Sequence, residues 1–193
     1  MEDFYKKALM KYGEDNIKSL GWGSTIGQQK RFKVFLQEMN PYNKSFLDVG
    51  CGFGDFYRYI DRRCKRYIGI DIEPEMIDIA RRKNPNGAFL TTDIIDFPAD
   101  KESFDYVVAS GLLALKREDW DENLSKTIRR MFDICRIAVG VNFTRCTDIT
   151  KINPDAHYSS QALVIGLLDS IKYKSLKIIV DYLPNDFTVI LYK

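Results

Sequence analysis

The sequence predicts an α/β fold, a three-layer αβα sandwich around a seven-stranded, mostly parallel sheet with an antiparallel last strand. Short apolar segments typical of buried strands alternate with segments of helical periodicity, which favours parallel strands joined by helical crossovers. The last two apolar segments, 175–182 and 187–192, are joined by the short connection 183–186. Because parallel strands need a much longer crossover, we expect these two segments to form an antiparallel hairpin.

Local signals set the boundaries of the expected elements. Ser24 or Thr25 can cap a helix, Pro74 suits a first helical turn, and 84–87 has the composition of a turn. We expect strands at 45–50, 67–72, 88–92, 104–109, 136–143, 175–182 and 187–192. We expect helical segments at about 1–20, 25–39, 54–64, 74–83, 121–135 and 159–171.

Length and composition are those of one ordinary domain. The 193 residues can bury a sizeable core, so we expect a single domain over 1–193, with a helical cap segment at 1–43 and an α/β core at 44–193. The formal net charge of +2 gives no strong attraction to nucleic acid or to a membrane. The four cysteines form no C-x-x-C pair, so we expect reduced thiols in the cytoplasm and no metal site. No apolar run is long enough for a transmembrane helix.

A glycine-rich turn follows the first expected strand. Gly50, Gly52 and Gly54 stand at alternate positions, where they allow a sharp turn and close approach of a ligand to the backbone. A dinucleotide fingerprint would need its third glycine where Asp55 stands, and that carboxylate would repel a pyrophosphate. The second strand ends in Asp71, the position of a ribose-binding carboxylate in nucleotide-binding α/β units. The pattern therefore predicts a nucleoside-containing cofactor without a pyrophosphate.

The pattern Asp48-x-Gly50-x-Gly52-x-Gly54 resembles the first motif of the class I S-adenosylmethionine-dependent methyltransferases. The resemblance covers about 45–193 and implies their Rossmann-like fold, with S-adenosylmethionine as cofactor and S-adenosylhomocysteine as product. The positions that match the family's cofactor site are Asp48, Gly50, Cys51, Gly52, Gly54, Asp71, Ile72, Asp93, Ile94, Ser110, Trp22 and Arg31.

The resemblance also implies a role for the residues at the strand ends. Asp71 would accept hydrogen bonds from the ribose hydroxyls, with Ile72 against the adenine face. Asp93 would accept a hydrogen bond from the exocyclic amine of the adenine, with Ile94 against the ring. Asp48 would face the methionine amine. The alternatives are that Asp71 caps the helix that follows it and that Asp93 caps a turn.

The segment before the first strand resembles the cofactor-covering segment of small-molecule methyltransferases. Trp22 would hold the sulfonium by a cation–π contact, and Arg31 would pair with the cofactor's carboxylate. Ser110 would lie beneath the methionine part of the cofactor. The alternative is that Trp22 is a core anchor and Arg31 a solvated helix residue.

The residues that bind the methyl acceptor are expected in the loops that follow the strands. His157, the sole histidine, follows the fifth strand and is a candidate base or hydrogen-bonding group for the substrate, although a lone histidine is more often structural. Tyr158 and the connection 182–187 are candidates for the substrate pocket, with Tyr158 and Tyr182 as candidate substrate-binding residues. Ordinary hairpin packing is the alternative.

The residues after the fourth strand bear on the acceptor. They read Ala109-Ser110-Gly111-Leu112, without the Asn/Asp-Pro-Pro-Tyr motif of enzymes that methylate base amines or glutamine amides, and without the acidic ligands of catechol enzymes. We therefore expect in-line methyl transfer to a small-molecule acceptor, on oxygen, carboxylate or nitrogen, with no nucleic-acid or membrane partner. The alternatives are a nucleic-acid or protein methyltransferase and a non-catalytic cofactor-binding protein.

Overall fold

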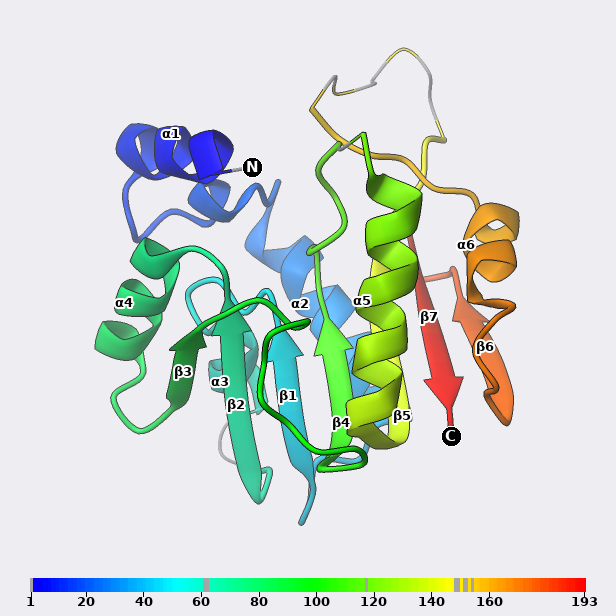
Figure 1. The fold of residues 1–193 in the computed structure, drawn as a ribbon. Coiled ribbons are helices and arrows are strands. Elements are labelled where there is room, and N and C mark those ends of the chain that lie inside the picture. The colour runs from blue at the N-terminus through cyan, green and yellow to red at the C-terminus, as the bar shows by residue number, and fades with distance from the viewer. Residues whose placement is uncertain (1, 61–62, 117, 148–149, 151–152, 154) are drawn as a thin grey trace.

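The computed structural model describes residues 2–60, 63–116, 118–147, 150, 153 and 155–193. Seven strands form one sheet in the order β3-β2-β1-β4-β5-β7-β6 (Figure 1). The strands are β1 (Ser45–Val49), β2 (Arg66–Asp71), β3 (Ala88–Thr91), β4 (Phe104–Ala109), β5 (Cys135–Thr144), β6 (Ser175–Ile179) and β7 (Asp186–Tyr192). The helices are α1 (Glu2–Tyr12), the 3-10 helix η1 (Ile17–Leu20), α2 (Thr25–Glu38), α3 (Asp55–Ile60), α4 (Pro74–Lys83), α5 (Trp120–Ile134) and α6 (Gln161–Leu168).

The direction of the strands confirms the expected sheet. β7 pairs antiparallel with both β5 and β6, whereas β1, β2, β3, β4 and β5 pair in parallel with their neighbours in that group. The expected hairpin of the last two strands is therefore present, and it places the start of β7 beside the end of β5, where Thr144 is the partner of Asp186.

Alternating side chains of the strands divide the core between the two faces of the sheet. Phe46 of β1 packs on one face with Phe35 of α2 and Phe56 of α3. Its neighbour Leu47 lies on the other face, in the cluster that contains Leu124 of α5. Helices thus cover both faces, with α5 on one side of the sheet and α2 and α3 on the other (Figure 1). The three-layer sandwich predicted from the sequence is confirmed.

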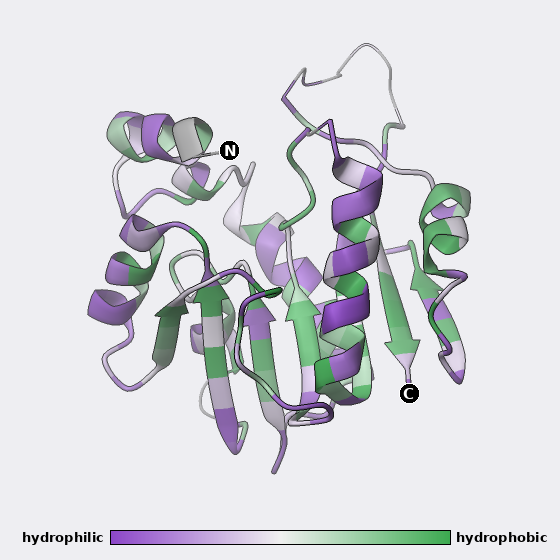
Figure 2. Ribbon diagram, in the orientation of Figure 1, coloured by the Kyte–Doolittle hydropathy of each residue, from purple (hydrophilic) through white to green (hydrophobic). Residues whose placement is uncertain are grey.

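Helix α5 is amphipathic, with one face buried against the sheet and the other exposed. Figure 2 shows hydrophobic residues along the central strands, while the outward side of α5 is hydrophilic. The buried residues of α5 recur at the spacing of one helix face: Trp120, Leu124, Thr127, Ile128, Met131, Phe132 and Ile134. No helix in the part of the chain that the structure describes is long and apolar enough to cross a membrane.

Some helices are shorter than expected. The segment expected as one helix over 1–20 is divided after α1 by Gly13, whose φ of +75° favours glycine. Ser24 caps α2 as predicted, since its Oγ accepts a hydrogen bond from the backbone N–H of Gly27 at 3.1 Å. This cap fixes the start of α2 directly after the turn that carries Trp22.

Candidate functional site

A first cavity, of about 730 Å³ including the space open to solvent, lies at the carboxyl ends of β1, β2 and β4. The sheet order places β1 between β2 and β4, so the loops after these strands meet where ligands bind in open α/β sheets. Those loops contribute Gly50 and Gly52, Asp71 and Glu73, and Ser110 to its wall.

The glycine turn forms one wall of the first cavity through its backbone. Gly50 and Gly52 have φ values of +71° and +52°, a conformation that side chains disfavour. A Cβ at Gly50 would lie 2.8 Å from Leu112, and a Cβ at Gly52 would lie 2.8 Å from Leu20. Any larger residue at either position would fill the space between the turn and its cover.

Asp71 holds this turn in place. Its Oδ2 accepts a hydrogen bond from the backbone N–H of Gly52 at 2.9 Å, and its Oδ1 accepts one from the N–H of Glu73 at 3.1 Å. Burial raises the pKa of the Asp71 carboxyl. The alternative role as helix cap is not seen, because Glu73 occupies the N-cap position of α4. Asp71 therefore joins the ends of β1 and β2 while it lines the cavity.

Asp48 is the buried acid of the site. It is 3% exposed, and Oδ2 accepts a hydrogen bond of 2.5 Å from the hydroxyl of Tyr67 on β2. Burial raises the pKa of Asp48 to about 7, although the hydrogen bond from Tyr67 lowers it. The nearby carboxylates of Asp71 and Asp55 also raise it. A carboxyl with such a pKa changes charge near neutral pH.

The charge of the first cavity favours a cation. Four carboxylates line it, and no lysine or arginine among the residues that the structure describes does so. One of the four, Asp55, accepts a hydrogen bond from Nε2 of Gln28 at 2.9 Å and also pairs with Arg58. The carboxylates are Asp48, Asp55, Asp71 and Glu73. A pyrophosphate would be repelled here, whereas a sulfonium and an ammonium would be attracted.

Residues from the N-terminal segment cover the first cavity. Tyr5 of α1, Leu20 of η1 and Trp22 line it, and Figure 1 shows α1 beyond the carboxyl ends of the strands. Burial raises the pKa of Tyr5, and the carboxylates of Asp71 and Glu73 raise it further. The ring of Tyr5 is therefore held beside the acidic end of the cavity.

A second cavity, of about 1130 Å³ with its open space, adjoins the first. The two share Tyr5, Leu20, Trp22 and Gly111. Gly111 has a φ of +80°, and a Cβ there would lie 3.0 Å from the ring of Trp22. The remaining wall of the second cavity comes from α2, from the loops after β4 and β5 and from the connection before β7. Trp22 thus stands where the two cavities meet.

The comparisons with known proteins agree with this geometry. The sequence profile of the methyltransferase-domain family matches residues 46–136. A protein of Mycobacterium tuberculosis that is named as a methyltransferase is 30% identical over 159 residues, which are 77% of this chain and 93% of that protein. The chain belongs to the class I S-adenosylmethionine-dependent methyltransferases. It is an enzyme of that family, and its cofactor is S-adenosylmethionine.

Two further relatives of this methyltransferase are more distant. The demethylmenaquinone methyltransferase of Thermotoga maritima is 28% identical over 93 residues, which are 47% of this chain and 40% of that protein. The magnesium protoporphyrin IX methyltransferase of Synechocystis, solved with bound S-adenosylhomocysteine, shares the fold with a TM-score of 0.67 at 16% identity. That match covers 87% of this chain and 83% of the other.

The structure brings together most of the residues that the methyltransferase motifs single out. The first cavity is lined by Asp48, Gly50, Cys51, Gly52, Asp71, Ile72, Ser110 and Trp22. Gly54, Asp93 and Ile94 do not line it. Asp93 is exposed and its Oδ1 accepts a hydrogen bond from the N–H of Ile95, as in the capped-turn alternative, while Ile94 is buried in the core.

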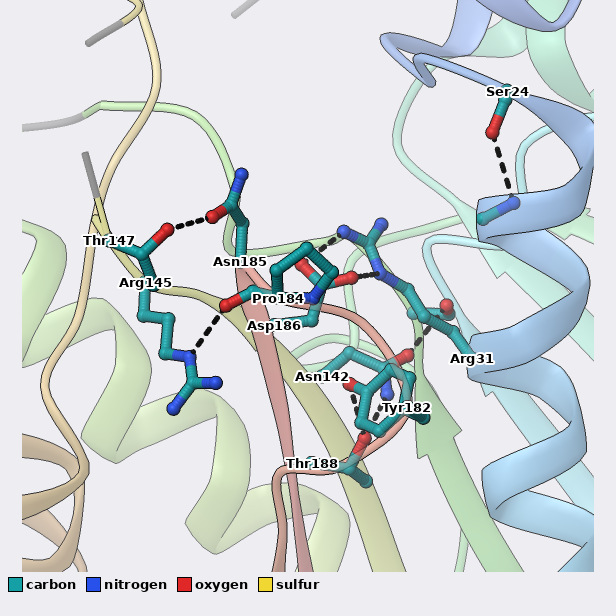
Figure 3. Close-up of polar contacts among 12 residues, drawn as sticks. Ser24, Arg31, Asn142, Arg145, Thr147, Tyr182, Pro184, Asn185, Asp186 and Thr188 are labelled. Atoms are coloured by element: carbon teal, nitrogen blue, oxygen red, sulfur yellow. Dashed lines mark hydrogen bonds and ion pairs between the residues drawn. The ribbon is translucent and has the colours of Figure 1, made fainter. Parts of the chain in front are cut away.

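Arg31 has a different partner from the expected one. Its Nε and Nη2 donate to the two carboxylate oxygens of Asp186 at 2.7 and 2.6 Å, as Figure 3 shows. Its guanidinium also lies 4.4 Å from the ring centre of Trp22. Arg31 lines the second cavity and not the first, so its charge is directed to Asp186 instead of a cofactor carboxylate. It is not the solvated residue of the alternative either, because its side chain is 15% exposed.

His157 packs against protein residues and does not face either cavity. Its ring stacks on Trp120 at 3.7 Å with an interplanar angle of 12°, and its backbone N–H donates to the carbonyl of Ala114. Burial lowers the pKa of His157, and its Nε2 has no hydrogen-bond partner among the described residues. His157 lines neither cavity. The expected base thus lies in the loop after β5 with its ring outside both cavities, and its backbone joins this loop to the loop after β4.

The two candidate tyrosines have different positions. Tyr158 lines the second cavity, and its hydroxyl accepts a hydrogen bond from the N–H of Asn153 at 2.9 Å. Tyr182 lines neither cavity. Its hydroxyl accepts a hydrogen bond from Thr188, which in turn accepts one from Asn142 (Figure 3). Asn142 accepts the hydroxyl of Ser110, so Tyr182 ends a buried network that begins at the first cavity.

Sequence reasoning missed several lining residues. Tyr5 and Leu20 have no motif, and only the return of the N-terminal segment over the sheet places them in the site. Asp186 lies in the connection 182–187 that was expected to supply part of the substrate pocket, but nothing local predicts its pairing with Arg31. Gln28, which also lines the first cavity, stands between Trp22 and Arg31 in the segment that resembles the cofactor-covering segment of small-molecule methyltransferases. This resemblance is the one sequence signal that points to Gln28.

Proposed function

We propose that this methyltransferase transfers a methyl group to a small-molecule acceptor held in the second cavity. The observation that carries the proposal is the junction of the two cavities at Trp22 and Gly111, next to an acidic cofactor cavity. When bound, S-adenosylmethionine supplies an electrophilic methyl group on a sulfonium that carries its own leaving group. The chain's own task is then to align the acceptor and exclude water.

We assign the cofactor contacts to residues that line the first cavity. Asp71 would hold the ribose hydroxyls, Ile72 the adenine, and Asp48 the methionine ammonium. The ring of Trp22 would face the sulfonium. Gly50 and Gly52 fit this cofactor, because both line the first cavity and a ligand can approach their backbone without meeting a Cβ.

Three features support a small acceptor. The named demethylmenaquinone relative acts on a small molecule. The cap formed by α1, η1 and Trp22 covers the site, and the described lining holds no cluster of basic residues for a nucleic-acid backbone. As parts of the same proposal, we treat 1–193 as a single domain with residues 1–43 as its cap, and we place the protein in the cytoplasm, where its four free thiols would persist.

The direct test is calorimetric titration with S-adenosylmethionine, S-adenosylhomocysteine and NAD in parallel. We expect the first two to bind and NAD to show no heat of binding, because the four carboxylates of the first cavity repel its pyrophosphate. Binding of NAD alone would overturn the assignment of the first cavity. A methyl-transfer screen of small acceptors then tests the second cavity.

Asp48 predicts a pH dependence of cofactor binding. With a pKa of about 7, Asp48 is mostly protonated at pH 6 and mostly ionised at pH 8. The ionised form attracts the cofactor's ammonium, so S-adenosylmethionine should bind more tightly as pH rises, by up to roughly tenfold between pH 6 and 8 if only the ionised form binds. Calorimetry at the two pH values measures this difference.

Two variants show whether Asp48 is the titrating group. In Asp48→Asn, the pH dependence should disappear. In Tyr67→Phe, the loss of the hydrogen bond that lowers the pKa of Asp48 should move the transition to higher pH. A dependence that persists in Asp48→Asn would assign it to another group.

A further inference from the structure

In the lining of the second cavity that the structure describes, one arginine and one aspartate carry charge, and they neutralise each other. Arg31 and Asp186 are the charged residues in its described lining. Both carboxylate oxygens of Asp186 accept hydrogen bonds from Arg31, and the two side chains are only 3% and 15% exposed respectively. A bidentate pair of this kind is held by geometry as well as by charge.

The surroundings of the pair keep the arginine from turning to a ligand. Trp22 stacks on the guanidinium at 4.4 Å, and the two partners are held by α2, which carries Arg31, and by β7, which begins at Asp186. Figure 3 shows the guanidinium directed at Asp186. Arg145 lies nearby, but its Nε donates to the carbonyl of Pro184 at 3.0 Å and it is not part of the lining.

The rest of the described lining is neutral. Aromatic and aliphatic side chains include Phe4, Leu115, Tyr158 and Leu183, and the polar ones, such as Thr144, carry no charge. Because Asp186 already occupies Nε and Nη2 of Arg31, an acceptor carboxylate could take up a bidentate pair with these donors only by separating Arg31 from Asp186, which would leave Asp186 buried without its partner. Such an arrangement is strongly unfavourable.

We propose that the acceptor of this methyltransferase is an uncharged aromatic or apolar molecule, and that the Arg31–Asp186 pair excludes anionic acceptors. The inference deepens the proposed function and rests on it. Trp22 and Tyr158 both line the second cavity and would contact an uncharged ring there, with its reactive oxygen or nitrogen toward the junction of the cavities. The same pair that stabilises the cap thus sets the charge that the acceptor pocket accepts.

A matched pair of ligands tests this selectivity. Naphthalen-1-ol and 1-naphthoate share a ring system, and at pH 7 the first is neutral and the second is an anion. Equilibrium dialysis in the presence of S-adenosylhomocysteine measures their affinities for the native protein. We expect naphthalen-1-ol to bind at least about tenfold more tightly than 1-naphthoate.

Two carboxylate-to-amide variants show whether the pair is responsible. Asp186→Asn frees the guanidinium of Arg31, so the affinity for 1-naphthoate should rise at least about tenfold. Glu38→Gln is the matched control. Glu38 of α2 is also a carboxylate paired with a cation, Lys177, but it lines neither cavity. The ligand preference of this variant should equal that of the native protein.

The outcomes separate the inference from the function on which it rests. If the native protein binds 1-naphthoate as tightly as naphthalen-1-ol, or binds neither while it binds S-adenosylhomocysteine, the inference is overturned and the cofactor assignment stands. An unchanged preference in Asp186→Asn would also overturn it. Failure to bind S-adenosylhomocysteine would overturn the proposed function together with the inference. The native comparison decides the matter even if Asp186→Asn does not fold.

Discussion

Replacing Arg31 with alanine is expected to lower the free energy of unfolding by about 3–5 kcal/mol. The reason is the state of Asp186, which is 2% exposed and would be left as a buried carboxylate without its bidentate partner. The ring of Trp22 would lose its stacked guanidinium at the same time. Urea denaturation of the native and variant proteins measures the difference.

A second ion pair between α2 and the C-terminal hairpin gives the control. Lys177 of β6 donates to Glu38 of α2 at 2.6 Å, but the lysine is 54% exposed. Lys177→Ala should therefore cost less than about 1 kcal/mol. If Arg31→Ala costs no more than Lys177→Ala, the Arg31–Asp186 pair is not a buried pair in solution, and its role in acceptor selection falls with it.

Replacing Asp71 with alanine should weaken S-adenosylmethionine binding by about 1.5–3 kcal/mol, or roughly 10- to 150-fold. Two effects act in the same direction. The variant loses the carboxylate proposed to hold the ribose, and it loses the acceptor that fixes the N–H of Gly52 at 2.9 Å. Calorimetric titration with S-adenosylmethionine measures the change, and circular dichroism checks that the variant is folded.

Asp78 provides the matched control for Asp71. It is an aspartate of the adjoining helix α4, its side chain is 65% exposed, and it contacts Arg81 at 3.7 Å on the surface. Asp78→Ala should leave the affinity unchanged. Asp71→Asn keeps one acceptor oxygen and should lie between the native protein and Asp71→Ala. An unchanged affinity in Asp71→Ala would mean that the ribose lies elsewhere.

Patterns that act over a few residues predicted the fold and many of the residues that line the first cavity. Buried strands can be recognised from their apolar composition, and the short connection 183–186 permits only an antiparallel hairpin. Positive φ values at Gly50 and Gly52 are a local requirement that glycine meets in any tertiary context. Asp71 is the last residue of β2, and the glycine turn follows β1. Because consecutive parallel strands are usually neighbours in the sheet, the sequence predicts that Asp71 lies beside this turn.

Helix boundaries were less well predicted, and the physical reason is also local. Gly13 ends α1 because a left-handed residue stops the helix there, although the aromatic spacing continues beyond it. α6 is likewise shorter than the segment 159–171, because Ser160 caps it and the helix ends at Leu168. Neither change moves a strand, but the break at Gly13 separates α1 from η1, which contribute Tyr5 and Leu20 respectively to the lining of the first cavity.

By itself, the sequence determined the sheet, the glycine turn, the acids at the strand ends and hence the family. Only the tertiary structure decided which side chains meet across the site. Arg31 and Asp186 are 155 positions apart, His157 stacks on Trp120, and Tyr67 donates to Asp48. Backbone conformation is set by neighbouring residues, whereas the partner of a charged or aromatic side chain is set by the packing of distant elements. Much of the lining of the first cavity could therefore be predicted from motifs, while the charge of the second cavity emerged from the folded chain.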